Sequence, residues 1–282
     1  MTAATATTTS LPAPRALARQ AFLALLWRDV RVLRKNFRHF VLRTAMQPLL
    51  FTFVFAYVFP KIGQGIGGPP QNGGTSFATV LVPGLVAVAI VFQGIQAVAL
   101  PLVQEFSYTK EIEDRVLAPM PVHLVGFGKV CNGAMQAMLS AFLVFPIVML
   151  VHAKGQAPDV RIANPALFLL VLVLAAFLGA SFGLLIGTSV APQQVPLIFS
   201  IIVLPLTLLG CIYYPWSTLS PIPWLKYGVL VNPLVYMSEG MRSALTPDVP
   251  HMRVWVVLLA MACATAVLLT QALRKFRQRV VV

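Results

Sequence analysis

Half of the few carboxylates of this chain lie close together in the sequence, where they could form an acid–base or metal site. Only eight of its 282 residues are Asp or Glu. Four share one ten-residue window: Glu105, Glu111, Glu113 and Asp114. Acid–base or metal sites need convergent His, Asp and Glu groups, and the nearest His is His123, at the far end of the segment. We therefore expect 104–123 to be a water-exposed loop that is either a docking surface or simply solvated.

Glu239 is the strongest single candidate for a functional residue. Asn232-Pro233 predicts a helix start, because Asn caps a helix and Pro fits its first position. From there Tyr236, Glu239 and Arg242 lie on one face at helical spacing. An ionisable group at membrane depth is costly and usually functional. Glu239 either pairs with Arg242 or Tyr236 to hold this segment, or takes part in gating or substrate contact.

Other chemistries lack the required residue patterns. No stretch matches GxxxxGK[ST], the phosphate-binding loop of ATPases, and the nearest lookalike, Gly126–Lys129, has the wrong spacing. Cys131, Cys211 and Cys263 are isolated, and the four His residues show no metal-ligand spacing. We expect no catalytic residue, cofactor or metal in this chain, so any ATP and Mg²⁺ would be bound by a separate partner.

The composition indicates an all-α integral membrane protein. Apolar residues make up 58% of the chain and charged residues 10%, against roughly 45–50% and about 25% in soluble domains. Long apolar stretches recur along the sequence, and a helix of roughly 20 such residues crosses a bilayer. After a disordered N-terminus, 1–14, the sequence predicts a single transmembrane domain over 15–282.

The basic residues flank the apolar stretches. The net charge is +13. Eight Lys and Arg precede the first span and four follow the last: Arg15, Arg19, Arg28, Arg31, Arg34, Lys35, Arg38, Arg43, Arg274, Lys275, Arg277 and Arg279. Basic flanks mark the cytoplasmic side, so both termini should lie in the cytoplasm, below a plasma or inner membrane crossed an even number of times. This placement argues against nucleic-acid binding.

Six spans satisfy this requirement. They are expected at 44–59, 77–103, 124–151, 165–190, 197–214 and 252–273. Gly179, Ser181, Gly183 and Gly187 would allow the fourth span to approach a neighbour closely. The Pro-rich segment 215–251 should enter and leave the membrane on the external side as a re-entrant helical hairpin.

Residues 15–40 predict an amphipathic helix in the membrane interface. Phe22, Leu26, Val30, Leu33 and Phe37 form one arc, and Arg28, Arg31, Lys35 and Arg38 form the opposite one. Such a helix turns its cations toward anionic lipid and water. The other interpretation is an ordinary basic flank.

Polar and aromatic groups in the spans are candidates for a translocation path. They are Gln47, Phe51, Phe55, Gln93, Gln96 and Phe199. Hydrogen bonds between helices are at least as good an explanation for the Gln residues, and packing is the favoured one for the Phe residues.

Three motifs together resemble the permeases of the ABC type-2 exporter family. They are Val-Pro-Gly-Leu at 82–85, Arg-Val-Leu-Ala-Pro-Met-Pro at 115–121, and Asn-Pro-Leu-Val-Tyr-Met-Ser-Glu-Gly-Met-Arg at 232–242, preceded by Tyr-Tyr-Pro-Trp at 213–216. The resemblance runs from about Arg28 to Leu273.

The resemblance implies partners and roles. Such permeases work as a homodimer, or with a related permease, together with two copies of an ATP-binding subunit. The docking residues would be Arg28, Arg31, Lys35, Glu105, Glu111, Glu113, Asp114 and Arg115. Asn232, Tyr236, Glu239 and Arg242 would lie at an external gate.

The cargo expected from the resemblance is a hydrophobic or amphipathic molecule, such as a drug, a lipid or a lipo-oligosaccharide. Phe-Ala-Tyr-Val-Phe at 55–59 and the absence of Leu-Gly-x-x-Trp before the first span favour it. Export of lipid-linked polysaccharide is the alternative. An ion-coupled secondary transporter should carry ionisable groups in several spans, and only Lys129, near a span edge, fits.

Overall fold

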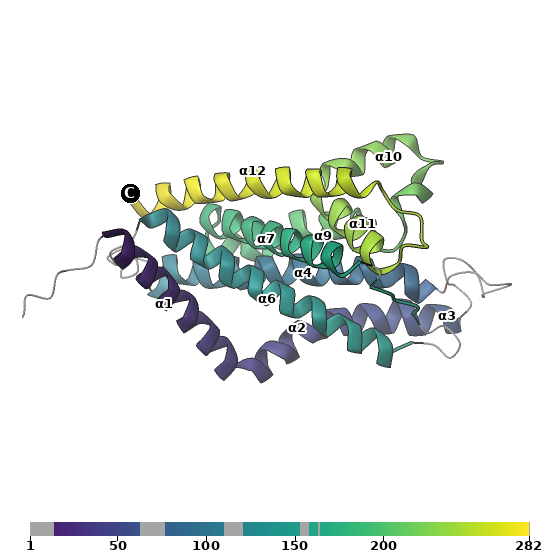
Figure 1. The fold of residues 1–282 in the computed structure, drawn as a ribbon, viewed down its shortest axis with the longest axis horizontal. Coiled ribbons are helices and arrows are strands. Elements are labelled where there is room, and N and C mark those ends of the chain that lie inside the picture. Colours follow the sequence, from purple (N-terminus) through teal and green to yellow (C-terminus); the bar gives the residue numbers. More distant parts are fainter. Residues whose placement is uncertain (1–13, 63–76, 110–120, 153–157, 163, 282) are drawn as a thin grey trace, which may run out of the picture.

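A computed structural model describes residues 14–62, 77–109, 121–152, 158–162 and 164–281. All regular structure in these ranges is helical (Figure 1). The N-terminus expected to be disordered and most of the docking loop, including Glu111, Glu113, Asp114 and Arg115, lie outside the described residues. Within these described ranges, five helices are long and apolar enough to cross a membrane.

Helix α4 (Phe77–Gln104) is the centre of the molecule. It packs against α6 (Val122–Leu150), α7 (Pro165–Ser189) and α11 (Pro233–Leu245). The close approach expected of the fourth span is confirmed at Gly183, where a Cβ would lie 2.8 Å from the carbonyl oxygen of Gly94. Only glycine fits there, because the neighbour is backbone. Helices α4, α6 and α7 match the predicted second, third and fourth spans within a few residues.

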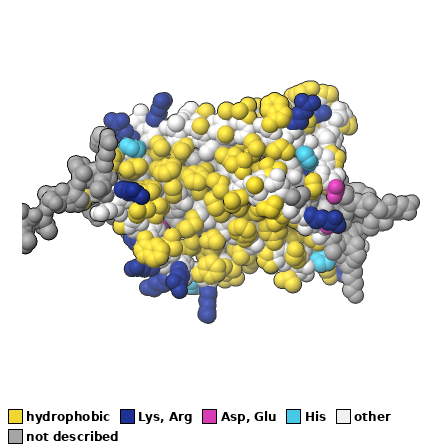
Figure 2. All heavy atoms as spheres, viewed as in Figure 1, with side chains coloured by type: hydrophobic (Ala, Val, Ile, Leu, Met, Phe, Trp, Pro, Cys, Tyr) yellow, Lys and Arg dark blue, Asp and Glu magenta, His cyan; other side chains and the backbone are white. Residues whose placement is uncertain are grey.

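The peripheral helices leave most of their apolar surface uncovered. In the most apolar window of α4, 89% of the residues are buried, compared with 22% in the span Phe37–Val58 and 17% in Val254–Val280. Apolar helices with so little protein cover need lipid or another chain against them. Figure 2 shows hydrophobic side chains over the middle of one face, with Lys and Arg along its left and lower-left edges and also at its right end.

The first two helices correct the expected boundary between the interfacial helix and the first span. Helix α1 (Pro14–Lys35) ends before Asn36, and α2 (Phe37–Thr52) begins directly after it. The two meet at a sharp elbow (Figure 1), and helical structure continues through η1 (Phe53–Val58) and α3 (Phe59–Lys61). Phe37 and Arg38 therefore belong to α2, and the span begins earlier than expected.

The burial pattern of α1 follows the expected arc only in part. Phe22, Leu26, Val30 and Leu33 are half-buried, and Arg28, Arg31 and Lys35 are exposed. However, Leu23 and Trp27 are also exposed, at 53% and 63%. The outward face of α1 is thus both basic and apolar, as in a helix that touches lipid as well as water.

The predicted fifth span is shorter and less regular than expected. Its helical part consists of α8 (Val195–Ile198), the π-helical turn η4 (Phe199–Val203) and α9 (Leu204–Leu208), which follow the 3-10 turn η3 (Pro192–Gln194). From 209 to 215 the chain is not helical. Phe199–Leu208 is apolar but falls below the length of a spanning helix.

Segment 215–251 forms short helices, as expected. They are η5 (Trp216–Leu219), α10 (Pro223–Gly228), η6 (Val229–Val231) and α11. Helix α11 packs against α4, α7 and α12 (Val254–Val281) and is buried along most of its length. The helix start at Asn232-Pro233 is confirmed, since the Asn232 side chain accepts a hydrogen bond from the Leu234 N–H at 2.9 Å.

The last helix is longer than expected and carries the basic tail. Helix α12 continues to Val281 rather than ending near Leu273. Its Arg279 donates to the carbonyls of Gly187, Thr188 and Val190, at the end of α7. The start of α1 and the end of α12 lie at the same end of the molecule (Figure 1), which we call the basic end.

Candidate functional site

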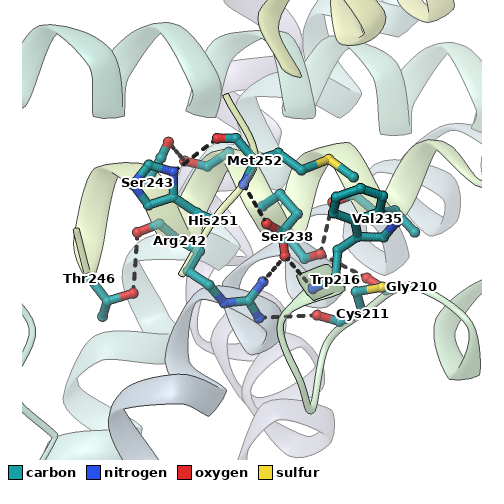
Figure 3. Close-up of polar contacts among 12 residues, drawn as sticks. Gly210, Cys211, Trp216, Val235, Ser238, Arg242, Ser243, Thr246, His251 and Met252 are labelled. Carbon is teal, nitrogen blue, oxygen red and sulfur yellow. Dashed lines mark hydrogen bonds and ion pairs between the residues drawn. The ribbon is translucent and has the colours of Figure 1, made fainter. Parts of the chain in front are cut away.

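The carboxylate of Glu239, on α11, joins three segments of the chain. Helix α11 lies toward the end of the molecule opposite the basic end (Figure 1), and Figure 3 shows Trp216, Arg242 and Met252 converging there. Glu239 Oε1 accepts hydrogen bonds from the Trp216 N–H, at 3.0 Å, and from the Arg242 guanidinium. Its Oε2 accepts from the Met252 N–H at 2.9 Å. One side chain of α11 therefore holds both the segment that precedes α10 and the segment that leads into α12.

Arg242 extends this network to a strained turn. Its Nη2 donates to the carbonyl of Cys211 at 3.1 Å. Cys211 has a φ of 52°, in the left-handed region that is uncommon for a residue other than glycine. Ser238 also holds this turn, because its hydroxyl donates to the carbonyl of Gly210 at 2.8 Å. The turn after α9 is thus fixed by two side chains of α11.

The burial of the Glu239–Arg242 ion pair limits the roles that this pair can have. Glu239 and Arg242 are both 0% exposed. A buried ion pair is expensive to break, because the remaining charge loses its partner in a medium of low dielectric. Of the two partners predicted for Glu239, Arg242 is present, whereas the Tyr236 hydroxyl donates instead to the Leu230 carbonyl at 2.9 Å. This geometry favours a role for Glu239 in positioning the surrounding segments. If Glu239 takes part in gating, the whole hydrogen-bonded network must move together.

A second candidate site is a cavity of about 340 Å³ between α2 and α4. It brings together four of the six predicted path residues: Gln47, Phe51, Gln93 and Gln96. Phe55 lies beside it, with its ring centroid 6.1 Å from that of Phe51 and 4.6 Å from that of Tyr213. Phe199 is half-buried in η4 and does not line this cavity.

A chain of polar side chains crosses the helices behind this cavity. The Thr44 hydroxyl donates to Gln93 Oε1 at 3.0 Å, and Gln93 Nε2 donates to Gln136 Oε1 at 3.2 Å. Gln136 Nε2 in turn donates to Asn132 Oδ1 at 3.2 Å. Gln93 therefore links neighbouring helices. This agrees with the interpretation that the intramembrane Gln residues form hydrogen bonds between helices.

The described docking candidates behave differently from one another. Arg28, Arg31 and Lys35 are exposed on α1, and Arg28 contacts Asp29 at 3.1 Å. The expectation that Glu105 belongs to an exposed loop is wrong. Helical structure continues from α4 through η2 (Glu105–Thr109), and Glu105 is buried against Lys129 of α6. A buried cation in an apolar span needs such a counter-charge.

Sequence reasoning missed a contact at the basic end. The guanidinium of Arg279 lies 4.6 Å from the centroid of the Phe106 ring, in the turn that leads into the charged loop. Lys275 donates to the Ser189 hydroxyl at 3.1 Å. From the sequence, the basic tail predicts only the topology of the chain. The helical spacing of Lys275 and Arg279 was the available sign that both face one neighbour.

Within the described ranges no three His, Cys, Asp or Glu side chains come together as they would to hold a metal ion. The side chains that converge are a buried ion pair, amides, hydroxyls and aromatic rings. These groups can position helices and contact an amphipathic molecule.

Comparison with known proteins agrees with this arrangement. The family model described as ABC-2 type transporter matches residues 20–246. The inner membrane transport permease YadH of Escherichia coli strain K12 is 28% identical over 233 residues, which cover 81% of this chain and 86% of the relative. YadH from Escherichia coli O157:H7 and from Shigella flexneri match to the same extent. This chain therefore belongs to the ABC-2 type transporter family, and it is a multi-pass permease of the inner membrane.

Proposed function

We propose that the chain is the membrane subunit of an ATP-driven exporter, in which two permeases work with two copies of a separate ATP-binding subunit. Family membership over residues 20–246 is the observation that carries this proposal. The sequence matches no phosphate-binding loop motif, and the proposal therefore assigns hydrolysis to the partner. ATP binding would close the two partner subunits, and the permease would convert that motion into outward opening.

Six crossings with both termini in the cytoplasm fit the contacts at the two ends of α12. Val190 lies beside Arg279 near the end of α12, and Cys211 belongs to the network that contains Met252, before its start. At 1.5 Å per residue, the 28 residues of α12 extend about 42 Å. A segment 190–211 that runs the length of α12 supports the proposal that the short fifth helix is a crossing element.

The docking surface for the ATP-binding subunit combines α1 with the charged loop. Arg28, Arg31 and Lys35 are exposed along α1, and Glu111, Glu113, Asp114 and Arg115 follow η2 in the sequence. Phe106 and Arg279 tie the base of that loop to α7 and α12. A force applied to the loop would thus reach two spans directly.

The second permease would cover the apolar surface of α9 and α10. Ile201, Leu204 and Leu208 are 61%, 54% and 54% exposed along one helix. Trp224 and Val231 flank them at 76% and 88%. Of these residues, Ile201, Trp224 and Val231 line a groove of about 540 Å³. The short helices α10 and α11 would then be a re-entrant hairpin at the outer mouth of the path between two permeases.

The cargo we propose is a hydrophobic or amphipathic small molecule or lipid. The cavity between α2 and α4 supports it, because its walls combine Phe51 and Phe92 with the amides of Gln47 and Gln96. In the described part of the chain these two Gln side chains make no hydrogen bond, so they are available to a ligand. Export of a lipid-linked polysaccharide is the competing cargo.

The test is co-expression with a candidate ATP-binding subunit, purification through a tag on one chain, and measurement of stoichiometry and ATP hydrolysis. We expect two copies of each chain. Neutralising Glu111, Glu113 and Asp114 together, or replacing Arg28, Arg31 and Lys35 by Ala, should release the partner and abolish permease-dependent hydrolysis. The control is Arg161→Ala, which removes an exposed cation far from α1 in the sequence.

A folded permease that binds no ATP-binding subunit would contradict the proposal. The favoured function would then be that of an ion-coupled transporter, which a flux assay driven by an ion gradient would test. Unchanged hydrolysis after both sets of substitutions would contradict the docking surface alone.

A further inference from the structure

A second, polar cavity of about 390 Å³ lies beside the elbow between α1 and α2. Four helices form its walls, and each contributes residues at helical spacing. Helix α2 and the elbow contribute Asn36, His39 and Arg43, and α6 contributes Lys129, Asn132 and Gln136. The cavity therefore belongs to the packed fold of one chain and needs no second copy to complete it.

The charges that line this cavity leave a positive excess at Arg43. The Arg28 guanidinium contacts the Asp29 carboxylate at 3.1 Å, and Lys129 pairs with Glu105. Arg43 makes no ion pair or hydrogen bond with any residue in the described ranges. Its guanidinium has five N–H donors and prefers a planar, bidentate anion. A guanidinium of this kind is suited to a phosphate or carboxylate group.

Arg43 also lies where the polar cavity meets an apolar one. It lines the 340 Å³ cavity between α2 and α4 as well, together with Pro48, Leu50 and Phe51. Leu42, Met46 and Leu50, at four-residue spacing along α2, are 68%, 54% and 58% exposed. A molecule with an anionic head at Arg43 would find apolar surface for its chain next to the head.

We propose that Arg43 and the elbow cavity bind the anionic headgroup of a membrane amphiphile, whose acyl chain lies along α2. The inference deepens the proposed function, since the bound amphiphile would be cargo at its point of entry or a lipid that holds the elbow. The bidentate guanidinium supplies the attraction. The Asn36, Asn132 and Gln136 amides can hydrogen-bond the remaining oxygens.

The simpler explanation is that Arg43 only extends toward the membrane surface, as basic side chains near span ends do. Arg38 provides the comparison, because it is an exposed cation in the first turns of the same helix and lines neither cavity. If surface attraction were the whole cause, loss of Arg38 and loss of Arg43 would have equal effects.

The experiment uses the full chain, purified without any ATP-binding subunit and titrated with phosphatidylglycerol or phosphatidylcholine. Bound lipid is counted by native mass spectrometry. We expect preference for phosphatidylglycerol, about a tenfold loss of its affinity in Arg43→Ala, and intermediate binding in Arg43→Lys, which keeps the charge but not the fork. Arg38→Ala should bind like the unaltered chain.

Three results would overturn the inference. They are unaltered lipid binding in Arg43→Ala, an equal loss in Arg38→Ala, or displacement of the lipid by millimolar inorganic phosphate, which would make this a site for a free anion. If Arg43→Ala fails to fold, the phosphatidylglycerol affinities of Arg43→Lys and Arg38→Ala still test the inference. A chain that binds the ATP-binding subunit but no anionic lipid contradicts this inference alone. A chain that binds anionic lipid through Arg43 but associates with no ATP-binding subunit when the two are co-expressed contradicts only the proposed function.

Discussion

The guanidinium of Arg279 lies 4.6 Å from the centroid of the Phe106 ring and also donates to the Thr188 carbonyl at 2.9 Å. One side chain near the end of α12 thus holds the turn before the charged loop and the last carbonyls of α7. Helix ends leave such carbonyls without partners in the helix itself. A cation at this position donates hydrogen bonds to these carbonyls. It also interacts favourably with the negative end of the α7 helix dipole.

We expect Arg279→Ala to weaken both contacts. Hydrogen bonds to a charged group and a cation–π contact together suggest a loss of about 2–3 kcal/mol in the free energy of unfolding. The measurement is the thermal midpoint of the purified chain, followed by hydrolysis in the complex. Arg277→Ala is the control, because Arg277 is exposed on the same helix. Equal midpoints for the two variants would refute the assignment.

Glu239→Gln should destabilise the fold strongly. It leaves the guanidinium of Arg242 buried without its counter-charge, which costs about 3–5 kcal/mol. Tyr236→Phe removes one neutral hydrogen bond from the same helix and should cost about 1 kcal/mol. Folded yield and thermal midpoint measure both.

A double variant separates pairing from packing at this site. Glu239→Leu with Arg242→Met removes both charges, so it should recover part of the stability that Glu239→Gln loses. Normal folding and normal transport in Glu239→Gln would contradict the positioning role and the gating role together.

Gly84 should tolerate no side chain. A Cβ at this position would lie 2.2 Å from the carbonyl oxygen and 2.6 Å from the Cα of Ile212. Both are backbone atoms, so α4 or the turn after α9 would have to move. Gly84→Ala should therefore prevent folding or sharply lower the yield of folded chain. Gly228→Ala is the matched control, because no atom lies within 4 Å of its Cβ position, and it should be neutral or slightly stabilising.

Substitutions of the intramembrane Gln residues should separate stability from transport. Gln93→Leu breaks two hydrogen bonds between helices, each worth on average about 0.6 kcal/mol in a membrane. It should lower the thermal midpoint. Gln47→Leu and Gln96→Leu leave this chain of bonds intact, so they should change cargo-stimulated hydrolysis and leave the midpoint unaltered. The reverse pattern would show that the cavity does not contact cargo.

Several elements were predictable because their causes are local. Long apolar stretches predicted α4, α6 and α7, since helix formation in lipid follows from composition. Asn232-Pro233 predicted the start of α11, because a cap acts within one turn. The close approach at Gly183 was predictable as a property of small residues, although its partner Gly94 was not.

Other features were missed because local pattern does not contain them. The apolar arc of α1 was extended across Asn36 to Phe37, since periodicity cannot locate an elbow when the flanking residues keep the same character. Glu105 was assigned to an exposed loop because its neighbours in sequence are charged. Its partner Lys129 is 24 positions away, on another helix.

The sequence by itself determined that this chain is a helical membrane permease of its family, where the spans α4, α6 and α7 lie and which end is basic. These properties depend on composition, on spacing within a few turns and on motif order. Only the tertiary structure decided that Glu239 joins three segments, that Gln93 links two neighbouring helices and that Arg43 lies between two cavities. A buried polar group is stabilised by whichever partner packing brings to it, and packing depends on all the helices at once.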